Sequence, residues 1–389
     1  MNFNLFAYGF RPLFLAAGMA AFALVPLWAA SYVLGTPPAS GWPPTLWHAH
    51  EMVFGFVAAA VGGFMLTAVP SWTGQRGFAG RPLVVVSALW LAGRVLAAGS
   101  SFWPPAFVAL VDVAFLPAIG ILIAPLLLRE SNRNAPLLAV LAALTLINLT
   151  FHYALSRHDA PLAGRTLLVA IDIVLLLITV IGGRIVPAFT AAALKTRGDK
   201  SAGRNLKGLT PIAVICMVAV IIIDAGWPAS STAGWTAVVA ALVHVVRITQ
   251  WRTLRTLRDP IVWVLHLAYL WLPIGFGLKA VALLDGAAFS AFWLHALTIG
   301  AAATMILGVM TRAALGHTGR PLVVSPLITA AYLLLAAAAL VRVFGLALIG
   351  QPYPAVILLA AILWTAAFGL YLLVYTPILV GPRIDGKPG

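Results

Sequence analysis

Long apolar runs separated by short polar gaps fill almost the whole sequence. Within each run the apolar residues do not alternate with polar ones, which argues against the strands of a membrane β-barrel. Most runs have about 20 residues, the length of an α-helix that crosses a bilayer. Pro, Gly or charged residues punctuate most of the gaps. The pattern therefore predicts an all-α, polytopic membrane protein with a single integral membrane domain over residues 1–389. About twelve transmembrane helices are expected, at 10–34, 47–70, 82–99, 104–128, 135–155, 162–188, 209–227, 232–250, 260–283, 289–311, 322–345 and 355–380.

The composition agrees with a chain embedded in the lipid bilayer. Hydrophobic residues make up 62% of the chain and charged residues 9%, whereas a soluble protein has about 25% charged residues. The single cysteine, Cys216, excludes an internal disulfide and any iron–sulfur cluster held by several thiolates.

The net charge of +14 would suggest a nucleic-acid partner in a soluble protein, but here the distribution of the charge explains it without nucleic acid. Basic residues collect in the loops after even-numbered spans, which by the positive-inside rule places these loops and both termini in the cytoplasm. These loops hold 17 of the 24 lysine and arginine residues of the chain: Arg76, Arg81, Arg129, Arg133, Lys195, Arg197, Lys200, Arg204, Lys207, Arg247, Arg252, Arg255, Arg258, Arg312, Arg320, Arg383 and Lys387.

Two spans begin with a histidine that is followed by a stripe of small residues. His50 heads one stripe and His295 the other. Imidazole is a common haem ligand, and two such helices could hold one haem between them. Small residues every four positions are also the ordinary packing surface of transmembrane helices, so both interpretations stay open. The small residues are Gly55, Ala59 and Gly63 after His50, and Gly300, Thr304 and Gly308 after His295.

His48 lies two residues before His50, so the two side chains are about 200° apart on a helix and are expected to have different roles. One could bind haem iron and the other copper or a proton. Glu51, one turn after His48, could orient the His48 ring or act only as a favourable carboxylate at a helix N-terminus.

The remaining histidines are weaker candidates. His266 lies deep in its span and is either functional or bonded to a carbonyl freed by Pro273. His317 follows span 10 and is either a loop anchor or a ligand. His152, at the outer end of span 5, is expected to meet water.

Several charges fall inside apolar runs and need partners. Arg94 and Asp112 are expected to form an ion pair. Asp172, Arg184 and Asp224 have no obvious mates. Arginines in or near spans could hold haem propionates by charge-assisted hydrogen bonds; Arg94, Arg184 and Arg342 qualify, and Arg11 lies at the inner edge of span 1.

Spans 2 and 6 share a Gly-Gly pair followed by a Val-Pro string, at 62–63 and 69–70 and at 182–183 and 186–187. Spans 2, 6 and 10 are four apart, which suggests three four-helix units. This arrangement is similar to the catalytic subunit of haem–copper oxidases. The chain lacks the adjacent His-His pair of their span 7 and the histidine of their span 6, so a binuclear centre of that kind is not expected.

Several strings resemble the NnrS family from residue 8 to about residue 324. They are YGFRP (8–12), WHAHEMVFG (47–55), LTAVPSWTG (66–74), GRIVPAFT (183–190), HALTIG (295–300), GVMTR (308–312) and GHTGR (316–320). The resemblance implies a bacterial inner-membrane protein that contains haem b and copper, takes part in the nitric oxide response and protects against nitrosative stress.

The family's motif histidines correspond to His48, His50, His266, His295 and His317, which we expect to be metal ligands. His50, His295, Arg11 and Arg184 are the expected cofactor-binding residues. No catalytic residue is assigned.

We therefore expect a haem and copper protein that binds nitric oxide, with membrane quinol as the natural electron donor if nitric oxide is turned over. The alternatives are a metal-dependent transporter of a small solute, and a sensor or iron-protecting factor without turnover.

Overall fold

The computed structural model describes residues 4–35, 40–129, 132–199, 206, 208–349 and 352–387. Every regular element in these ranges is a helix, as predicted. Lys200, Arg204 and Lys207, which the charge pattern places in a cytoplasmic loop, lie outside the described residues.

Twelve helical runs of the described chain are long and apolar enough to cross a membrane, which confirms the predicted number. Some runs contain more than one element. In chain order the spans are α1 (Phe10–Leu34); α2 (Pro44–His50), η1 (Glu51–Val57) and α3 (Ala58–Trp72); α4 (Arg81–Ala98); α5 (Pro105–Val113) and α6 (Phe115–Leu127); α7 (Pro136–Ser156); α8 (Ala160–Leu177), η3 (Ile178–Gly182) and α9 (Gly183–Thr196); α10 (Leu209–Gly226); α11 (Ser231–Thr249); α12 (Pro260–Leu284); η5 (Ala288–Ser290), α13 (Trp293–His295), η6 (Ala296–Ala303) and α14 (Thr304–His317); α15 (Pro326–Ile349); and α16 (Tyr353–Val380). Short 3₁₀ turns, η2 (Ser100–Phe102) and η4 (Thr253–Thr256), lie in loops.

Two spans are longer than the apolar pattern predicts. Span 6 runs to Thr196 and span 10 to His317, instead of ending at 188 and 311. Pro187, one residue before the predicted end of span 6, lies inside α9. Transmembrane helices tolerate proline because neighbouring groups form hydrogen bonds with the backbone carbonyls that proline leaves unpaired. The residues that continue each helix are less apolar, so the hydropathy pattern did not include them in the span.

Three π-helical segments occur in the described chain, and they lie in spans 2, 6 and 10, the spans that share sequence features. The first, η1, begins directly after His50, and the last, η6, directly after His295. π-Helical turns are rare and are often found at functional sites. Each of the three has a carbonyl that accepts a side-chain hydrogen bond: Gly55 from Trp90 Nε1 (2.9 Å), Thr179 from Arg247 Nη1 (2.7 Å) and Ile299 from Thr304 Oγ1 (3.1 Å).

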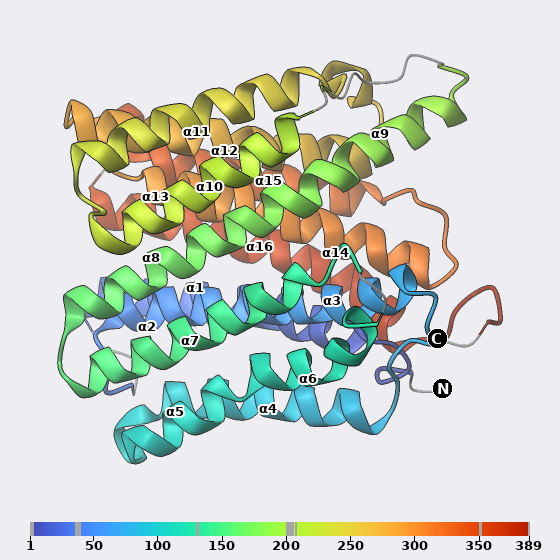
Figure 1. Cartoon of the computed structure of the whole chain (residues 1–389), viewed down its shortest axis with the longest axis horizontal. Coiled ribbons are helices and arrows are strands. Elements are labelled where there is room, and N and C mark those ends of the chain that lie inside the picture. The colour runs from blue at the N-terminus through green and yellow to red at the C-terminus, as the bar shows by residue number, and fades with distance from the viewer. Residues whose placement is uncertain are drawn as a thin grey trace. The chain divides into compact units, whose positions relative to one another are not determined.

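The chain forms two compact units (Figure 1). The first comprises Met1–Ala170, Met310–Leu322 and Phe368–Gly389, and the second Ile171–Val309 and Val323–Ala367. In the first, α1 packs on α3, α3 on α6, and α7 on both α5 and α6. In the second, α12 packs on α11, α9 and η6, and α10 packs on α11. The expectation of three four-helix units stays a prediction.

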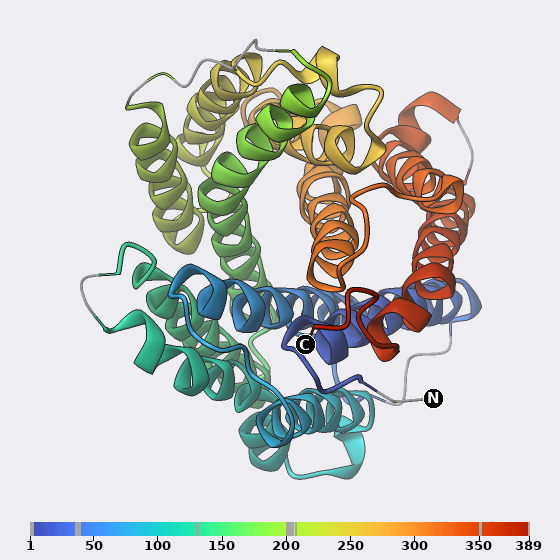
Figure 2. The ribbon, with the colours of Figure 1, turned by 90° about the vertical axis from the view of Figure 1, so that its right-hand side faces the viewer.

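The two ends of the first unit's chain are joined by hydrogen bonds. The backbone N–H of Asn4 donates to the carbonyl of Val380 at 2.8 Å, and the red end of α16 lies beside the blue start of the chain in Figure 2. Arg11 is fully buried, and its Nη1 donates to the carbonyls of Leu379 (2.8 Å) and Gly381 (2.7 Å). These bonds satisfy carbonyls that the C-terminus of a helix leaves without intrahelical partners.

Close packing of α1 on α3 leads to a prediction about Gly63. A Cβ at this position would lie 2.8 Å from Cδ1 of Phe14 and 3.1 Å from Cβ of Leu13. Gly63→Ala should therefore destabilise the protein by about 1–3 kcal/mol, the usual effect of overpacking, and lower the apparent Tm. The matched control is Gly120→Ala, whose Cβ would meet its nearest neighbour at 3.9 Å. Because alanine favours a helix over glycine, the control should keep or raise the Tm; equal losses in both variants would contradict the packing explanation.

Candidate metal centre

Three buried side chains of the first unit converge on one point. His50 Nε2 lies 3.1 Å from Asp112 Oδ2, and His152 Nε2 lies 2.9 Å from the same oxygen. One ligand atom from each residue lies within 4.8 Å of the others, which is the spacing of a metal site. Among the described residues this is the only group of three or more His, Cys, Asp or Glu side chains with that geometry.

Local helix geometry places these residues. His50 is the last residue of α2, directly before the π-helical turn η1. Asp112 lies at the end of α5, just before that span is interrupted at Ala114. His152 lies on α7 one turn after Asn148, so both face the same side. Asn148 Nδ2 donates to Asp112 Oδ2 at 2.8 Å, and Asn148 Oδ1 lies 3.0 Å from His50 Nε2.

Arg94 of α4 is the cation that pairs with the carboxylates of the centre. It forms buried ion pairs with both Asp112 and Glu51. The predicted pair of Arg94 and Asp112 is thus confirmed. The expectation that Glu51 orients His48 is wrong, because Glu51 Oε1 lies 3.2 Å from Nδ1 of His50 instead. Arg94 accounts for the difference, because it pairs with both Glu51 and Asp112 and so holds the Glu51 carboxylate beside His50.

The hydrogen bonds of His50 leave room for a metal at one nitrogen. When Nδ1 donates to Glu51, Nε2 carries a lone pair, and this pair faces two oxygens, those of Asp112 and Asn148. That arrangement needs a positive group beside Nε2, either a proton or a metal ion. Histidines that bind metals usually donate their other ring N–H to a carboxylate in this way, so the donor set fits a metal ion.

Aromatic rings enclose the centre. The ring of Phe151 stacks on His50 at a centroid distance of 4.6 Å, and Phe54 lies at 4.9 Å. Trp42 meets His50 edge-on at 5.0 Å and His152 at 5.5 Å. Such an apolar shell excludes water and strengthens electrostatic interactions inside it.

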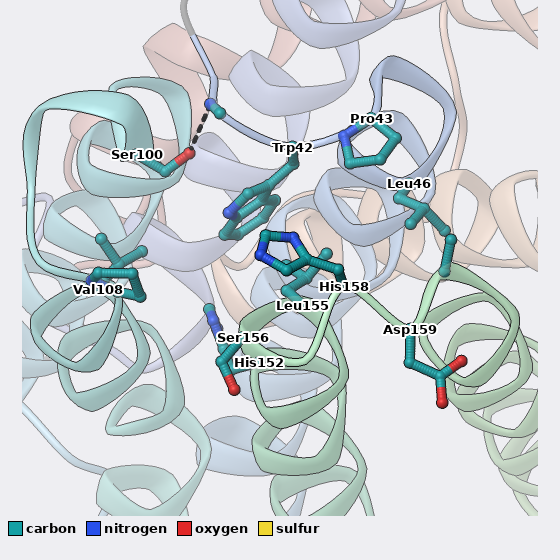
Figure 3. Close-up of a pocket in the computed structure, with 13 residues that line it drawn as sticks. Trp42, Pro43, Leu46, Ser100, Val108, His152, Leu155, Ser156, His158 and Asp159 are labelled. Carbon is teal, nitrogen blue, oxygen red and sulfur yellow. Dashed lines mark hydrogen bonds between the residues drawn. The ribbon is translucent and has the colours of Figure 1, made fainter.

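A pocket of about 390 Å³ adjoins the centre (Figure 3). Trp42 and His152 line it together with the exposed His158 and Asp159. The volume suits a small ligand. The prediction that His152 meets outer water is wrong: the side chain is buried and bonds Asp112, because α7 turns it toward α5, although part of it borders the pocket.

The small-residue stripes are filled by protein side chains. A Cβ at Gly55 would lie 3.2 Å from Arg94 Cδ, and one at Gly308 would lie 2.8 Å from Leu265 Cδ2. At Gly300 the ring of Trp271 takes up the space. A porphyrin lying against these stripes does not fit this packing, so helix packing explains the small residues. The haem-ligand roles of His50 and His295 stay predictions.

His48 and His50 have separate surroundings, as their spacing on a helix requires. His48 stacks on Trp28 at 4.3 Å, outside the metal centre. His295, in the second unit, is partly buried, and its ring centroid lies 6.5 Å from that of Phe292. Arg184 is exposed in α9. None of the three lies in the His50, Asp112 and His152 group.

His317 belongs to a structural cluster at the ends of α14 and α16. Its ring stacks on Tyr8 at 5.5 Å, and its carbonyl accepts a hydrogen bond from Arg383 Nη1 at 2.7 Å. Burial raises the pKa of the Tyr8 phenol. Hydrogen bonds from Arg383 lower the pKa of Asp385 to about 2. The YGFRP and GHTGR strings thus meet in one place, where these contacts favour the loop-anchor interpretation of His317.

In the second unit, His266 uses both ring nitrogens for hydroxyl groups. Nε2 lies 2.7 Å from Thr190 Oγ1, and Nδ1 lies 3.0 Å from Thr253 Oγ1. The alternative of a bond to a carbonyl freed by Pro273 is therefore wrong. A separate network joins His244 Nδ1 to the Tyr269 hydroxyl at 2.9 Å, and that hydroxyl accepts from Arg247 Nη1 at 3.0 Å.

Asn148 and Trp42 are among the members of the centre that sequence reasoning missed. The four-residue spacing of Asn148 and His152 placed two polar side chains on one face of an apolar helix, which was a usable signal. Trp42 lies in a loop before α2, and nothing in its surroundings in the sequence indicated a role.

The role of Arg94 can be tested by stability. Arg94→Gln leaves Glu51 and Asp112 buried without their cation, which should destabilise the protein by about 3–5 kcal/mol and markedly lower the apparent Tm. Arg165→Gln is the control, because this exposed arginine of the same unit should change stability by less than about 0.5 kcal/mol. An unchanged Tm for Arg94→Gln would mean that the ion pairs do not hold the centre together.

Comparison with known proteins identifies the chain at the level of its family. No curated relative matches the sequence. The family model described as NnrS protein matches residues 4–383, which include both the metal centre and the cluster around His317. With nearly the whole chain covered, the protein belongs to the NnrS family.

Proposed function

We propose that the protein binds copper at the His50, Asp112 and His152 centre and uses it to bind nitric oxide, as an inner-membrane protein that protects against nitrosative stress. The observation that carries the proposal is the convergence of two imidazoles on one buried carboxylate. Imidazole suits copper, zinc, iron and nickel. Family membership and its link to the nitric oxide response favour copper among them.

Each side chain has a distinct task in this proposal. His50 and His152 would supply nitrogen ligands, and Asp112 an oxygen ligand. Glu51 orients the His50 ring by accepting from Nδ1 at 3.2 Å. Arg94 pairs with both carboxylates but compensates only one of their two charges, so the centre without a metal carries a net charge of about −1. A bound copper ion would supply an open coordination position for a diatomic ligand.

The pocket offers a path for a small uncharged ligand. It runs from the exposed loop at His158 to His152, and its wall at Trp42 separates the loop from His50. Nitric oxide is small and nonpolar enough to enter such a space without a hydrogen-bond donor. We place both termini in the cytoplasm, from the distribution of basic residues, and membrane quinol is the electron donor we propose for any turnover.

Haem b is a separate part of the proposal, supported by the resemblance of the motif strings. His50 Nε2 cannot bind haem iron and the copper ion at once. In this proposal the copper centre takes His50, and haem would be held elsewhere, with His295 the first histidine to test.

Metal analysis tests the copper centre. His152→Ala should lower copper affinity by more than about 100-fold, the upper end of the effect of losing an outer-shell partner, because it removes a direct ligand. His158→Ala is the matched control, since His158 borders the same pocket but lies outside the centre. Full copper content in both variants, or zinc or iron in place of copper in the wild type, would overturn the assignment. Size-exclusion profiles and Tm values identify any variant that fails to fold.

Absorption spectra of the purified protein test haem and nitric oxide binding together. Oxidised and reduced spectra should show haem b, and His295→Ala should abolish it while copper is retained. Nitric oxide should change the copper-dependent spectrum of the wild type and leave that of His152→Ala unchanged. A protein produced with haem available that shows no haem bands would remove haem from the proposal without affecting the copper centre.

A further inference from the structure

A second group of buried charges lies in the second unit. Lys279 of α12 forms a buried ion pair with Asp224 of α10. The Lys279 ammonium also lies 5.0 Å from the ring centroid of Trp293. Asp224, for which the sequence suggested no partner, therefore has one. Lysine can satisfy an aspartate in this way at membrane depth because a paired charge is far less costly than a single one.

Asp172 of α8 lies beside this pair and differs from both of its members. The charges of Asp224 and Lys279 act on it directly. Its side chain is 1% exposed, and neither carboxylate oxygen accepts a hydrogen bond from a donor among the described residues; the group that interacts with it is the carboxyl of Asp224. An ionised carboxylate without partners is among the most expensive groups to bury in a protein.

A proton on one carboxyl group balances the charges of Asp172, Asp224 and Lys279. Two carboxyl groups share one ammonium, and Lys279 is engaged with Asp224. If both aspartates were ionised, the group would hold an uncompensated negative charge in a low-dielectric environment. When two carboxyl groups lie in unequal surroundings, one stays ionised and the other holds a proton. Asp224, which has the cation, is the ionised one.

We infer that Asp172 is the proton-binding residue of an intramembrane proton site, and that it exchanges its proton with Asp224. Proton binding at this site is an additional property, independent of copper, haem and nitric oxide.

The position of Asp224 gives the site a route for exchange. Asp224 lies two residues before the end of α10 at Gly226, and the next residue, Trp227, is exposed. Asp172 lies twelve residues into α8, about 18 Å along the helix from Ala160. A proton from the end of α10 would reach Asp224 first and then Asp172. When Asp172 releases its proton to Asp224, the Asp224 and Lys279 ion pair loses its negative partner, so the ammonium opposes a lasting transfer.

A proton fits the group better than a metal cation. A metal would need several ligand atoms gathered around one point, and in the described chain only the His50 centre has three such ligands. The Lys279 ammonium occupies the place that a cation would take beside Asp224. The group can therefore accept a proton without displacing a partner.

Infrared difference spectroscopy of the full-length purified protein tests the inference. A protonated carboxylic acid has its own C=O stretch, which shifts on exchange into D₂O. The chain has ten acidic residues. Glu51, Asp112 and Asp224 are paired with buried cations, and the other described acids are at least partly exposed except for Asp172. At neutral pH the wild type should therefore show one protonated carboxyl band, and Asp172→Asn should abolish it.

Two further variants separate proton binding from a structural role. Asp224→Asn should abolish the band although Asp172 is still present, because Asp172 is then the only carboxyl group beside the Lys279 ammonium and ionises to balance it. Asp172→Asn replaces a neutral acid with a neutral amide of the same shape, and its Tm should stay close to that of the wild type. Lys279→Met should add a second protonated carboxyl band, since Asp224 then loses its cation.

Three results would overturn the inference. The wild type could lack a protonated carboxyl band at neutral pH. The band could persist in Asp172→Asn. It could also disappear on addition of sodium chloride at constant pH, with proton release, which would make sodium the resident cation. None of these results depends on copper content, so the outcome is separable from that of the proposed function.

Discussion

The high free energy of an unpaired charge inside a membrane governs both buried groups of this protein. Arg94 lies between Glu51 and Asp112, and this triple ion pair brings α4, α5 and the start of η1 into fixed positions. His50 and His152 then receive their orientation from the same carboxylates. Without the guanidinium, two buried carboxylates would repel each other, and the histidines would have no common partner. Metal-binding geometry in this unit is thus a consequence of how its charges are neutralised.

The cost of an unpaired buried charge also governs the second unit, where it leads to a bound proton. Here a single ammonium faces two carboxyl groups, and the imbalance requires a proton on Asp172. In the first unit the carboxylates are balanced within one charge by Arg94, and a metal ion or an imidazolium provides the remainder. In both units an excess of buried negative charge creates a site for a cation. In the first unit the two imidazoles favour a metal ion, whereas in the second unit Asp172 binds a proton.

Hydropathy and charge spacing were sufficient to predict twelve helices, because each span must satisfy its own backbone hydrogen bonds in lipid. The ion pair of Arg94 and Asp112 followed from their similar depth in neighbouring spans. The metal centre could not be predicted in full, because the approach of α7 to α5 depends on helix packing that apolar periodicity does not encode. His152 was therefore assigned to water and Glu51 to the wrong histidine.

The stripes after His50 and His295 contain a feature that hydropathy alone does not explain. In both, the first small residue follows the histidine by five positions, and the later ones follow by four. Five residues is the hydrogen-bond step of a π-helix, whereas the α-helix uses four, and η1 and η6 begin where the longer step occurs. Each histidine therefore belongs to a helix that contains one residue more than a regular α-helix would need. One additional residue rotates the part of the helix before the π-helical turn by about 100° relative to the part after it. The face on which each histidine lies is therefore offset from the face that the same span uses for packing further along.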